Sequence, residues 1–346
     1  MKRKLSENIM PAGSGRKILS LLLVFSLFFA LAACGTQQKD EVTAQTEPVT
    51  IRIAGLKGPT SMGLVKLMED AEKGETGNRY VFSLHGSADE VTPKLIQGEL
   101  DMAAIPANLA AVLYNNTDGA VRVLAVNTLG VLYLVENGTS VTDFESLRGR
   151  TVYATGKGST PEYTLRYLLS ANGLDPDRDV TIEYRSEPAE VVSLLAAGEA
   201  IAMLPQPYVT AAQAKVPGLR TALDLNKAWE DQGTDSRLIT GVLAARTDFI
   251  AQHPEEVQRF LEEYRASIEW VCADPAAASG LIEKYDIAKA AVAEAALPAC
   301  NITFISGNTM AASLTGYLRT LYEQNPKAVG GKLPGESFCY TGPDSP

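Results

Sequence analysis

The sequence predicts an α/β fold of two similar, doubly wound lobes, in a chain of 346 residues that is 46% hydrophobic and 21% charged. From residue 50 onward, short apolar runs alternate with segments whose apolar residues recur at helical spacing, a pattern typical of parallel sheets covered by helices. A second observation is a five-residue pattern that occurs twice, one hundred residues apart. The first copy is Glu90, Val91, Leu95, Gly98 and Glu99, and the second copy is Glu190, Val191, Leu195, Gly198 and Glu199. Each copy leads into an apolar strand that ends at a proline. Two lobes fit this better than a solenoid, which needs shorter and more numerous repeats.

The first lobe begins with a strand, a glycine-rich turn at 55–61, and a helix with its apolar residues on one face. A second helix stops at Gly98, because glycine favours the left-handed conformation that closes a helix. We expect strands at 49–54, 80–84, 101–105 and 121–126, and helices from 62, at 90–97 and at 109–114.

The second lobe repeats this order. We expect a strand within 147–155, a glycine-rich turn at 156–161, a helix that ends near 173, a strand at 180–184, a helix around 190 and a strand that ends at 204–205. After residue 239 the chain is mostly helical, with one helix from Pro254 and another from about Gly307 to Asn325. Their apolar faces hold Val257, Phe260, Leu261, Tyr264 and Ile268, and Met310, Leu314, Tyr317, Leu318 and Leu321. We expect residues 330–346 to be loop, and Trp229 and Trp270 to pack in the fold.

The charge distribution excludes one class of partner. The chain has 41 acidic and 31 basic residues and a formal net charge of −10, and five of the basic residues lie within 1–33. A body this acidic, without a basic run, is not expected to bind nucleic acid through its surface field. With two histidines and four scattered cysteines, the sequence predicts no metal site, no catalytic triad and no cofactor.

The first segment has the features of an export signal. A basic stretch leads into an apolar block at 18–33, which is shorter than the roughly 20 residues of a membrane span. The block ends in Leu31, Ala32 and Ala33 before Cys34, which resembles a bacterial lipobox. This resemblance implies cleavage before Cys34, its acylation and a polar tether at 34–48; the alternative is a plain signal peptide with an incidental cysteine. We therefore expect the mature protein outside the cytoplasmic membrane, held to the cell membrane by its N-terminal lipid.

Three cysteines follow in the folded body, outside the cytoplasm, where thiols oxidise. Because three is an odd number, at most one pair forms. Cys272 lies at the end of a helical segment and Cys300 in the next connection, so we expect these two to form a disulfide and Cys339 to stay free. The alternative is that all three are reduced and buried as small apolar residues.

A longer stretch resembles a known family. The run from Leu147 to Pro161, continuing through 168–176 and 180–182, and the strand that ends before Gln206 and Pro207 are similar to the second lobe of ABC-transporter substrate-binding proteins of the nitrate, sulfonate and thiamine-precursor group. The resemblance covers about residues 49–325. It implies a type 2 periplasmic-binding-protein fold, with two lobes joined by a two-strand hinge and a ligand cleft between them. The crossings are expected near 133–136 and 238–243, so that the first lobe comprises 49–136 and 241–346 and the second comprises 137–240.

The glycine-rich turns and the strand ends supply the candidate ligand-binding residues. In open parallel sheets, ligands bind beyond the carboxyl ends of the strands, where helix N-termini favour anionic or strongly polar groups. The candidates are Lys57, Gly58, Thr60 and Ser61 in the first turn, Lys157, Ser159 and Thr160 in the second, and His85, Asn108, Asn127, Gln206 and Tyr208 at other strand ends. The alternatives are local roles, namely helix capping for the hydroxyls, surface or core packing for the histidine and the tyrosine, and turn formation for the asparagines.

The resemblance implies an extracytoplasmic solute-binding protein of an ABC importer rather than an enzyme. It would capture a small polar or anionic organic solute, such as a sulfonate or a pyrimidine, by closure of its lobes and deliver it to a permease and its ATPase. We expect a monomer that contacts the membrane only through its lipid. Two alternatives stay open: a ligand sensor or adaptor with the same fold, and an enzyme of the thiamine-pyrimidine type, whose chemistry depends on clustered cysteines that this sequence lacks. No motif selects the ligand.

Overall fold

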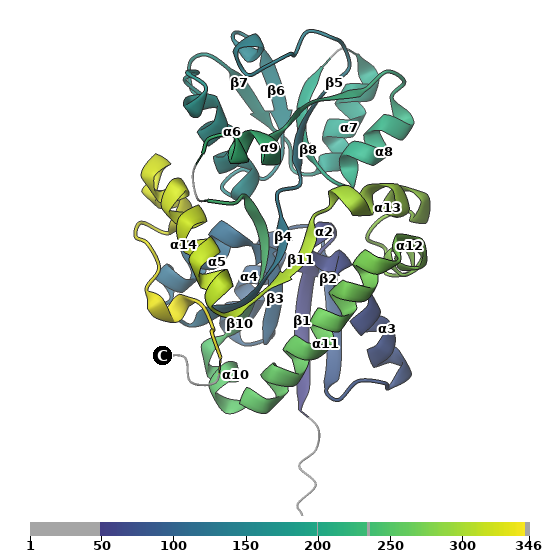
Figure 1. Cartoon of the computed structure of the whole chain (residues 1–346), viewed down its shortest axis with the longest axis vertical. Coiled ribbons are helices and arrows are strands. Elements are labelled where there is room, and N and C mark those ends of the chain that lie inside the picture. Colours follow the sequence, from purple (N-terminus) through teal and green to yellow (C-terminus); the bar gives the residue numbers. More distant parts are fainter. Residues whose placement is uncertain (1–48, 199, 234–235, 343–346) are drawn as a thin grey trace, which may run out of the picture. The chain divides into compact units, whose positions relative to one another are not determined.

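Two mixed β-sheets with surrounding helices form the fold in the computed structural model, which describes residues 49–198, 200–233 and 236–342 (Figure 1). The six-stranded sheet has the order β11-β4-β10-β3-β1-β2, and the five-stranded sheet has the order β7-β6-β8-β5-β9. The expected export signal, Cys34 and the tether lie outside the described residues. Within the described ranges, no helix is long and apolar enough to cross a membrane.

The first sheet combines strands from the beginning and the end of the chain. Its strands are β1 (Thr50–Leu56), β2 (Arg79–His85), β3 (Met102–Pro106), β4 (Val121–Leu129), β10 (Ile239–Arg246) and β11 (Ile302–Ile305). The helices between its first four strands are α2 (Pro59–Met62), α3 (Val65–Lys73), α4 (Ala88–Gln97) and α5 (Ala107–Asn116). Helix α4 stops where the glycine predicts it, because Gly98 has a φ of 79° and its N–H bonds back to the carbonyl groups of the last helical turn.

The second sheet is formed by one continuous stretch of chain. Its strands are β5 (Leu132–Glu136), β6 (Thr151–Ala154), β7 (Thr181–Tyr184), β8 (Ile201–Pro205) and β9 (Arg220–Asp224), with η1 (Glu145–Leu147), α6 (Thr160–Ala171), α7 (Pro188–Ala197), α8 (Tyr208–Lys215) and α9 (Leu225–Glu230). The C-terminal part adds α10 (Thr247–Gln252), α11 (Pro254–Ala273), α12 (Pro275–Lys284), α13 (Ala290–Ala296), η2 (Leu297–Ala299), α14 (Gly307–Gln324), η3 (Pro326–Val329) and η4 (Glu336–Phe338). The apolar faces predicted for α11 and α14 are buried, as expected.

The two sheets repeat one topology, which confirms the internal repeat. The orders β2-β1-β3-β10-β4 and β7-β6-β8-β5-β9 correspond strand for strand, and the first three strands of each are parallel. Neither sheet is wholly parallel, because β10 is antiparallel to β3 and β4, and β5 is antiparallel to β8 and β9. β5 and β10 are the first strands after the two points where the chain crosses from one sheet to the other. Each of them runs antiparallel to both of its neighbours.

The first crossing lies earlier in the chain than expected. Strand β5 pairs along its whole length with β8, from Leu132 opposite Pro205 to Glu136 opposite Ile201, and it also pairs with β9. Residues 132–136 therefore belong to the second sheet and not to the first lobe, and the link between the sheets is residues 130–131. The chain returns with β10 at Ile239, within the range expected for the second crossing.

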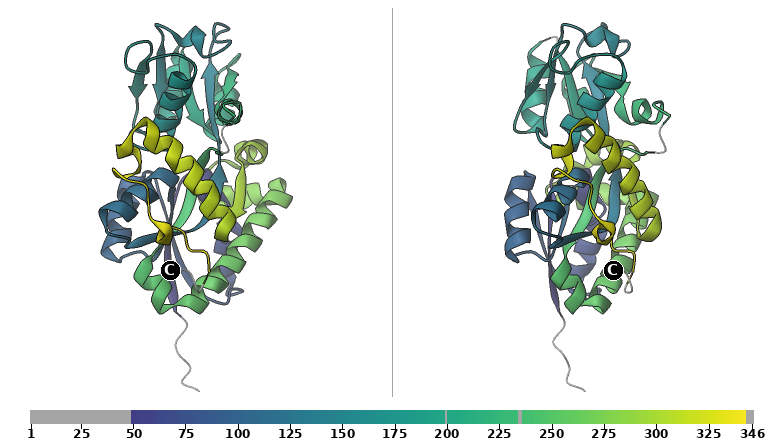
Figure 2. Two further views of the ribbon diagram at one scale, coloured as in Figure 1. Left: turned by 60° about the vertical axis from the view of Figure 1, so that its left-hand side comes forward. Right: turned by 90° about the vertical axis from the view of Figure 1, so that its left-hand side faces the viewer.

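Helix α14 joins the two sheets through a shared hydrophobic core. The largest buried apolar cluster contains residues of both sheets, such as Ile105 of β3 and Met203 of β8. Within it the ring of Trp229 lies between Tyr167 of α6 and Tyr317 of α14, with centroids 4.5 and 5.6 Å away. Figure 2 shows α14, in yellow, extending from the first sheet toward the second, and it contacts α5 as well as α6.

The C-terminal tail is more ordered than the expected loop. The 3₁₀-helix η3 packs against α5, and Asn115 donates to the carbonyl groups of Val329 and Lys332 at 2.6 Å. Further along, Cys339 forms an isolated bridge with Val123, and the N–H of Tyr340 donates to the Val123 carbonyl at 2.8 Å. The tail therefore covers part of the first sheet, because backbone hydrogen bonding holds it on β4.

The expected disulfide is absent, because the three described cysteines are free. Cys300 is fully buried among apolar side chains, and burial raises its pKa to about 12. Cys272 is exposed, and its Sγ lies 3.6 Å from the carbonyl oxygen of Ile302. The two thiols thus occupy different surroundings, one in the interior and one at the surface. Cys339, expected to be free, is free and buried.

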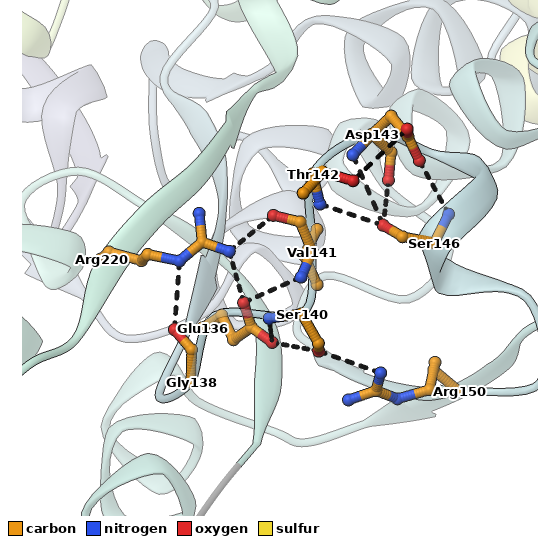
Figure 3. Close-up of polar contacts among 9 residues, drawn as sticks. All are labelled: Glu136, Gly138, Ser140, Val141, Thr142, Asp143, Ser146, Arg150 and Arg220. Carbon is orange, nitrogen blue, oxygen red and sulfur yellow. Dashed lines mark hydrogen bonds and ion pairs between the residues drawn. The ribbon is translucent and has the colours of Figure 1, made fainter.

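The buried carboxylate of Glu136 lies at the C-terminal end of β5, away from the crossing between the sheets (Figure 3). Glu136 is 2% exposed and accepts hydrogen bonds from the N–H groups of Ser140 and Val141 at 2.9 and 3.0 Å. Arg220, the first residue of β9, donates to Glu136 at 2.6 Å and also to the Gly138 carbonyl at 3.1 Å. Burial raises the pKa of Glu136, but the hydrogen bond from the hydroxyl of Ser140, together with those from the two N–H groups and Arg220, outweighs burial and lowers the pKa to about 2. One side chain therefore fixes the turn after β5 and the pairing of β5 with β9.

Candidate functional site

The candidate residues lie where the parallel strands of the two sheets end. Strands β1, β2 and β3 lead into the segments that carry Lys57 to Ser61, His85 and Asn108, and β6 and β8 lead into those that carry Lys157 to Thr160, Gln206 and Tyr208. The neighbouring carboxyl ends of parallel strands bring these residues to one edge of each sheet. Asn127 lies within β4, near its end.

Two candidates from different sheets bind each other directly. The Oγ1 of Thr160, at the start of α6, donates to Oδ1 of Asn108 at 3.1 Å, and both side chains are fully buried. The amide of Asn108 also donates to the carbonyl of Ala328 at 3.1 Å and, at 3.5 Å, to that of Gly158. The hydroxyl of Tyr317 donates to Thr160 Oγ1 at 3.3 Å. The strand ends of the two sheets thus meet at a buried polar contact, to which the C-terminal segment contributes.

Lys57 and Tyr208 approach each other from the two sheets. Lys57 Nζ forms an ion pair with Asp286 at 2.5 Å, and this bond lowers the pKa of the Asp286 carboxyl. Burial raises the pKa of the Tyr208 hydroxyl; the negative charge of Glu187 raises it further, and the positive charge of Lys57 opposes both. These causes place Lys57 of the first lobe near Tyr208 and Glu187 of the second.

His85 lies beside a carboxylate at the end of β2. Its Nδ1 is 3.2 Å from Oε2 of Glu90, and its Nε2 is 3.1 Å from the hydroxyl of Ser83. The hydrogen bond from His85 lowers the pKa of Glu90. Both ring nitrogens therefore have partners within the first lobe.

The hydroxyls of the first glycine-rich turn are buried. Gly58 precedes α2, and the side chains of Thr60 and Ser61 within that helix have little or no exposed surface. Asn127, also buried, donates to the Thr60 carbonyl at 3.3 Å. The Oγ of Ser61 has no hydrogen-bond partner among the described residues. This oxygen leaves no space for a side chain on Gly55, because a Cβ at Gly55 would lie 2.1 Å from Ser61 Oγ.

Three other candidates have partners within the second lobe. Lys157 Nζ lies 5.8 Å above the ring of Tyr184, and Ser159 Oγ donates to the Gly156 carbonyl at 2.8 Å. Gln206 Oε1 accepts from the hydroxyl of Thr210 at 2.9 Å in the first turn of α8. Their positions were predicted, but their side chains serve local structure here. Among the described residues, no group of three or more His, Cys, Asp or Glu side chains is placed to hold a metal ion.

Comparison with known proteins identifies the family. A sequence model of the NMT1-like family matches residues 79–285, more than half of the chain. The chain belongs to the NMT1-like family. No curated protein sequence matches it.

Solved structures share the fold of this NMT1-like chain. A structure described as an ABC transporter from Parabacteroides distasonis has a TM-score of 0.71 at 24% identity, over 84% of this chain and 98% of that one. The periplasmic aliphatic sulphonate-binding protein of Escherichia coli has a TM-score of 0.69 at 18% identity, over 86% and 93%. The periplasmic nitrate-binding protein of Synechocystis has a TM-score of 0.55 at 18% identity, over 69% and 67%. These likenesses confirm the expected periplasmic-binding-protein fold.

Four residues that sequence reasoning did not single out belong to the site of this NMT1-like chain. Tyr317 was predicted only as part of an apolar helix face, and Asp286 lies in the turn after α12, where no motif marks it. Glu187 precedes α7, and its carboxylate and that of Glu90 both lie near Gly86. Arg185 directly follows β7, one hundred residues after His85 at the end of β2, so the internal repeat could have indicated it.

Proposed function

We propose that the chain is the extracytoplasmic solute-binding component of an ABC importer, which captures a small organic solute and delivers it to a permease and its ATPase. The observation that supports this most is the meeting of strand ends from two topologically equivalent sheets at Asn108 and Thr160. Ligand sites in such sheets lie beyond the strand ends. The neighbours from Escherichia coli and Synechocystis are periplasmic binding proteins, and the proposed role agrees with theirs.

The proposed mechanism is reversible binding by closure of the two lobes. A solute that contacts both strand-end edges binds the closed arrangement more tightly than the open one, and this difference in affinity drives closure. Lys57 would meet the solute from the first lobe and Tyr208 from the second, and the bond between Asn108 and Thr160 would hold the closed arrangement. Binding of this kind leaves the solute chemically unchanged.

A ligand screen followed by scattering tests the proposal. Thermal shift assays on residues 48–346, which form one compact unit, should find a stabilising solute. Saturation at about 100 times the dissociation constant adds roughly 2.7 kcal/mol to the free energy of unfolding. Small-angle scattering should show compaction with that solute, and mass spectrometry should recover the solute intact. A solute recovered in altered form, or binding without compaction, would contradict the mechanism. Affinity capture of a membrane kinase or receptor instead of a permease and ATPase would favour the sensor alternative.

We also propose that Cys34 carries the lipid that anchors the protein to the membrane. The small residues before Cys34, at the end of an apolar block, support this. Intact mass spectrometry of the membrane-bound protein should show a mature chain that begins at an acylated Cys34, and Cys34→Ser should accumulate as uncleaved precursor. A wild-type chain that begins elsewhere and carries no acyl group would refute the anchor.

A further inference from the structure

The cationic side chains at the strand ends already have carboxylate partners. Lys57 pairs with Asp286 at 2.5 Å, across 229 residues of sequence. Arg185, directly after β7, pairs with Glu183 at 2.8 Å and lies over the ring of Tyr153. An anion that binds either cation must compete with a charge-assisted bond inside the chain.

The second glycine-rich turn is occupied in the same way. Backbone N–H groups of a glycine-rich turn can bind an anion where no group of the chain occupies them. Here the N–H of Gly158, two residues before α6, donates to Oε2 of Glu162 at 2.6 Å, so a carboxylate from the first turn of that helix occupies this N–H group. The neighbouring ammonium group of Lys157 lies over the ring of Tyr184.

One carboxylate, by contrast, faces the site without a partner, and a second is held only by His85. Glu187 forms no hydrogen bond or ion pair through its side chain with any other described residue. A Cβ placed on Gly86 would lie 3.6 Å from Glu90 Oε1 and 3.7 Å from Glu187 Oε1. The two carboxylates therefore approach one point from the two lobes, next to Tyr208 and His85.

From these contacts we propose that the site takes a polar organic solute without net negative charge, and that Asp286 and Glu162 exclude oxyanions by occupying the groups that would bind them. This inference rests on the proposed function, since it names the solute class of the same site. An uncharged or cationic solute leaves both internal bonds intact, and a cationic group gains the attraction of Glu187. A sulfonate would have to displace Asp286 from Lys57 or Glu162 from Gly158, and it would meet the unpaired carboxylate of Glu187.

The first test uses calorimetry with ethanesulfonate as the probe. In the double variant Asp286→Asn, Glu162→Ala, Lys57 and the N–H of Gly158 lose their carboxylate partners. Asparagine tolerates the left-handed backbone of residue 286, whose φ is 55°. We expect ethanesulfonate to bind the double variant at least tenfold more tightly than the wild type. Equal affinity, or binding that is undetectable in both proteins, would overturn the proposal, because the two carboxylates would then not be what excludes the anion.

A matched control removes a carboxylate from an ion pair away from the strand ends. Asp177 pairs with Arg166 at 2.7 Å on the second lobe, so Asp177→Asn changes the net charge without freeing a group at the site. We expect its affinity for ethanesulfonate to equal that of the wild type. A gain equal to that of the double variant would show a general charge effect and overturn the proposal. Unchanged melting temperatures establish that each variant is folded.

The second test compares solute classes on the wild-type protein. Thermal shift assays would use ethanesulfonate, uncharged cytosine and cationic thiamine at equal concentrations. A larger shift with either of the last two supports the proposal, and a larger shift with ethanesulfonate overturns it. The failure of the proposed function is a separate result, namely no compaction in small-angle scattering with a solute that does bind.

Discussion

The clearest stability prediction concerns Glu136, whose carboxylate holds the turn after β5. The change is Glu136→Gln, which keeps the shape of the side chain but removes its charge. Arg220 then loses its charged partner, and the N–H groups of Ser140 and Val141 compete for one weaker acceptor. We expect a lower free energy of unfolding with the fold intact.

The size of the effect follows from the lowered pKa. A fall from the ordinary value of 4.5 to about 2 corresponds to roughly 3 kcal/mol in favour of the folded state. Arg220 is one-third exposed, so solvent screens part of this energy. We therefore expect a loss of about 2 kcal/mol at pH 7 in the variant. Because the folded pKa is lowered, the contribution is complete above pH 4.5 and disappears as the pH falls toward 2.

Urea unfolding of residues 48–346 between pH 7 and pH 3 measures this contribution. The wild type should lose stability relative to the variant as the pH falls below 4.5, so that their difference shrinks. A matched control is Glu145→Gln, whose carboxylate pairs with Arg148 at 2.7 Å on the surface of the same lobe, and which should not change stability measurably. The reasoning fails if the two variants are equally stable at pH 7, or if the difference between wild type and Glu136→Gln does not depend on pH.

Two further predictions concern the contact between the lobes and the thiols. Asn108→Ala removes the acceptor of the hydrogen bond from Thr160 Oγ1, so it should lower the free energy of unfolding by about 2 kcal/mol. It should also increase the radius of gyration of the ligand-free protein in small-angle scattering. An unchanged radius of gyration would show that this bond does not hold the lobes together. Cys272 should react with a maleimide in the native protein, whereas Cys300 and Cys339 should react only after unfolding, and a cross-link between Cys272 and Cys300 in a non-reducing peptide map would contradict the free thiols.

The fold was predictable largely because the repeat is visible in the sequence. The equivalent helices at 90–97 and 190–197 are followed by apolar strands that end in prolines, and both sheets use these elements in the same order. The membership of residues 132–136 was not predictable, because a short run that is apolar up to its final glutamate has the same pattern in either sheet, and only its pairing partners decide. The antiparallel direction of β5 and β10 was not predictable either, because the hydrophobic periodicity of a strand does not show in which direction the strand runs.

The site was predictable in position and not in its contacts. Strand ends and glycine-rich turns located Asn108, Thr160 and Lys57, because local pattern determines where a strand stops. The partner of Lys57 is Asp286, far along the chain, and nothing local indicates that α12 returns to this place. The predicted disulfide was wrong for a related reason: the order of Cys272 and Cys300 along the chain says nothing about the direction in which each side chain points.

The place of β10 between β3 and β4 determines the order in which the molecule can assemble. A chain made from its N-terminus completes every strand of the second sheet, 132–224, before Ile239–Arg246 exists. Until then β3 and β4 have no common neighbour, and these strands, which are almost wholly buried in the finished fold, keep unpaired edges. The second lobe should therefore fold early and alone, while the first waits through about a hundred residues of further synthesis, the interval in which a nascent chain is most prone to aggregate.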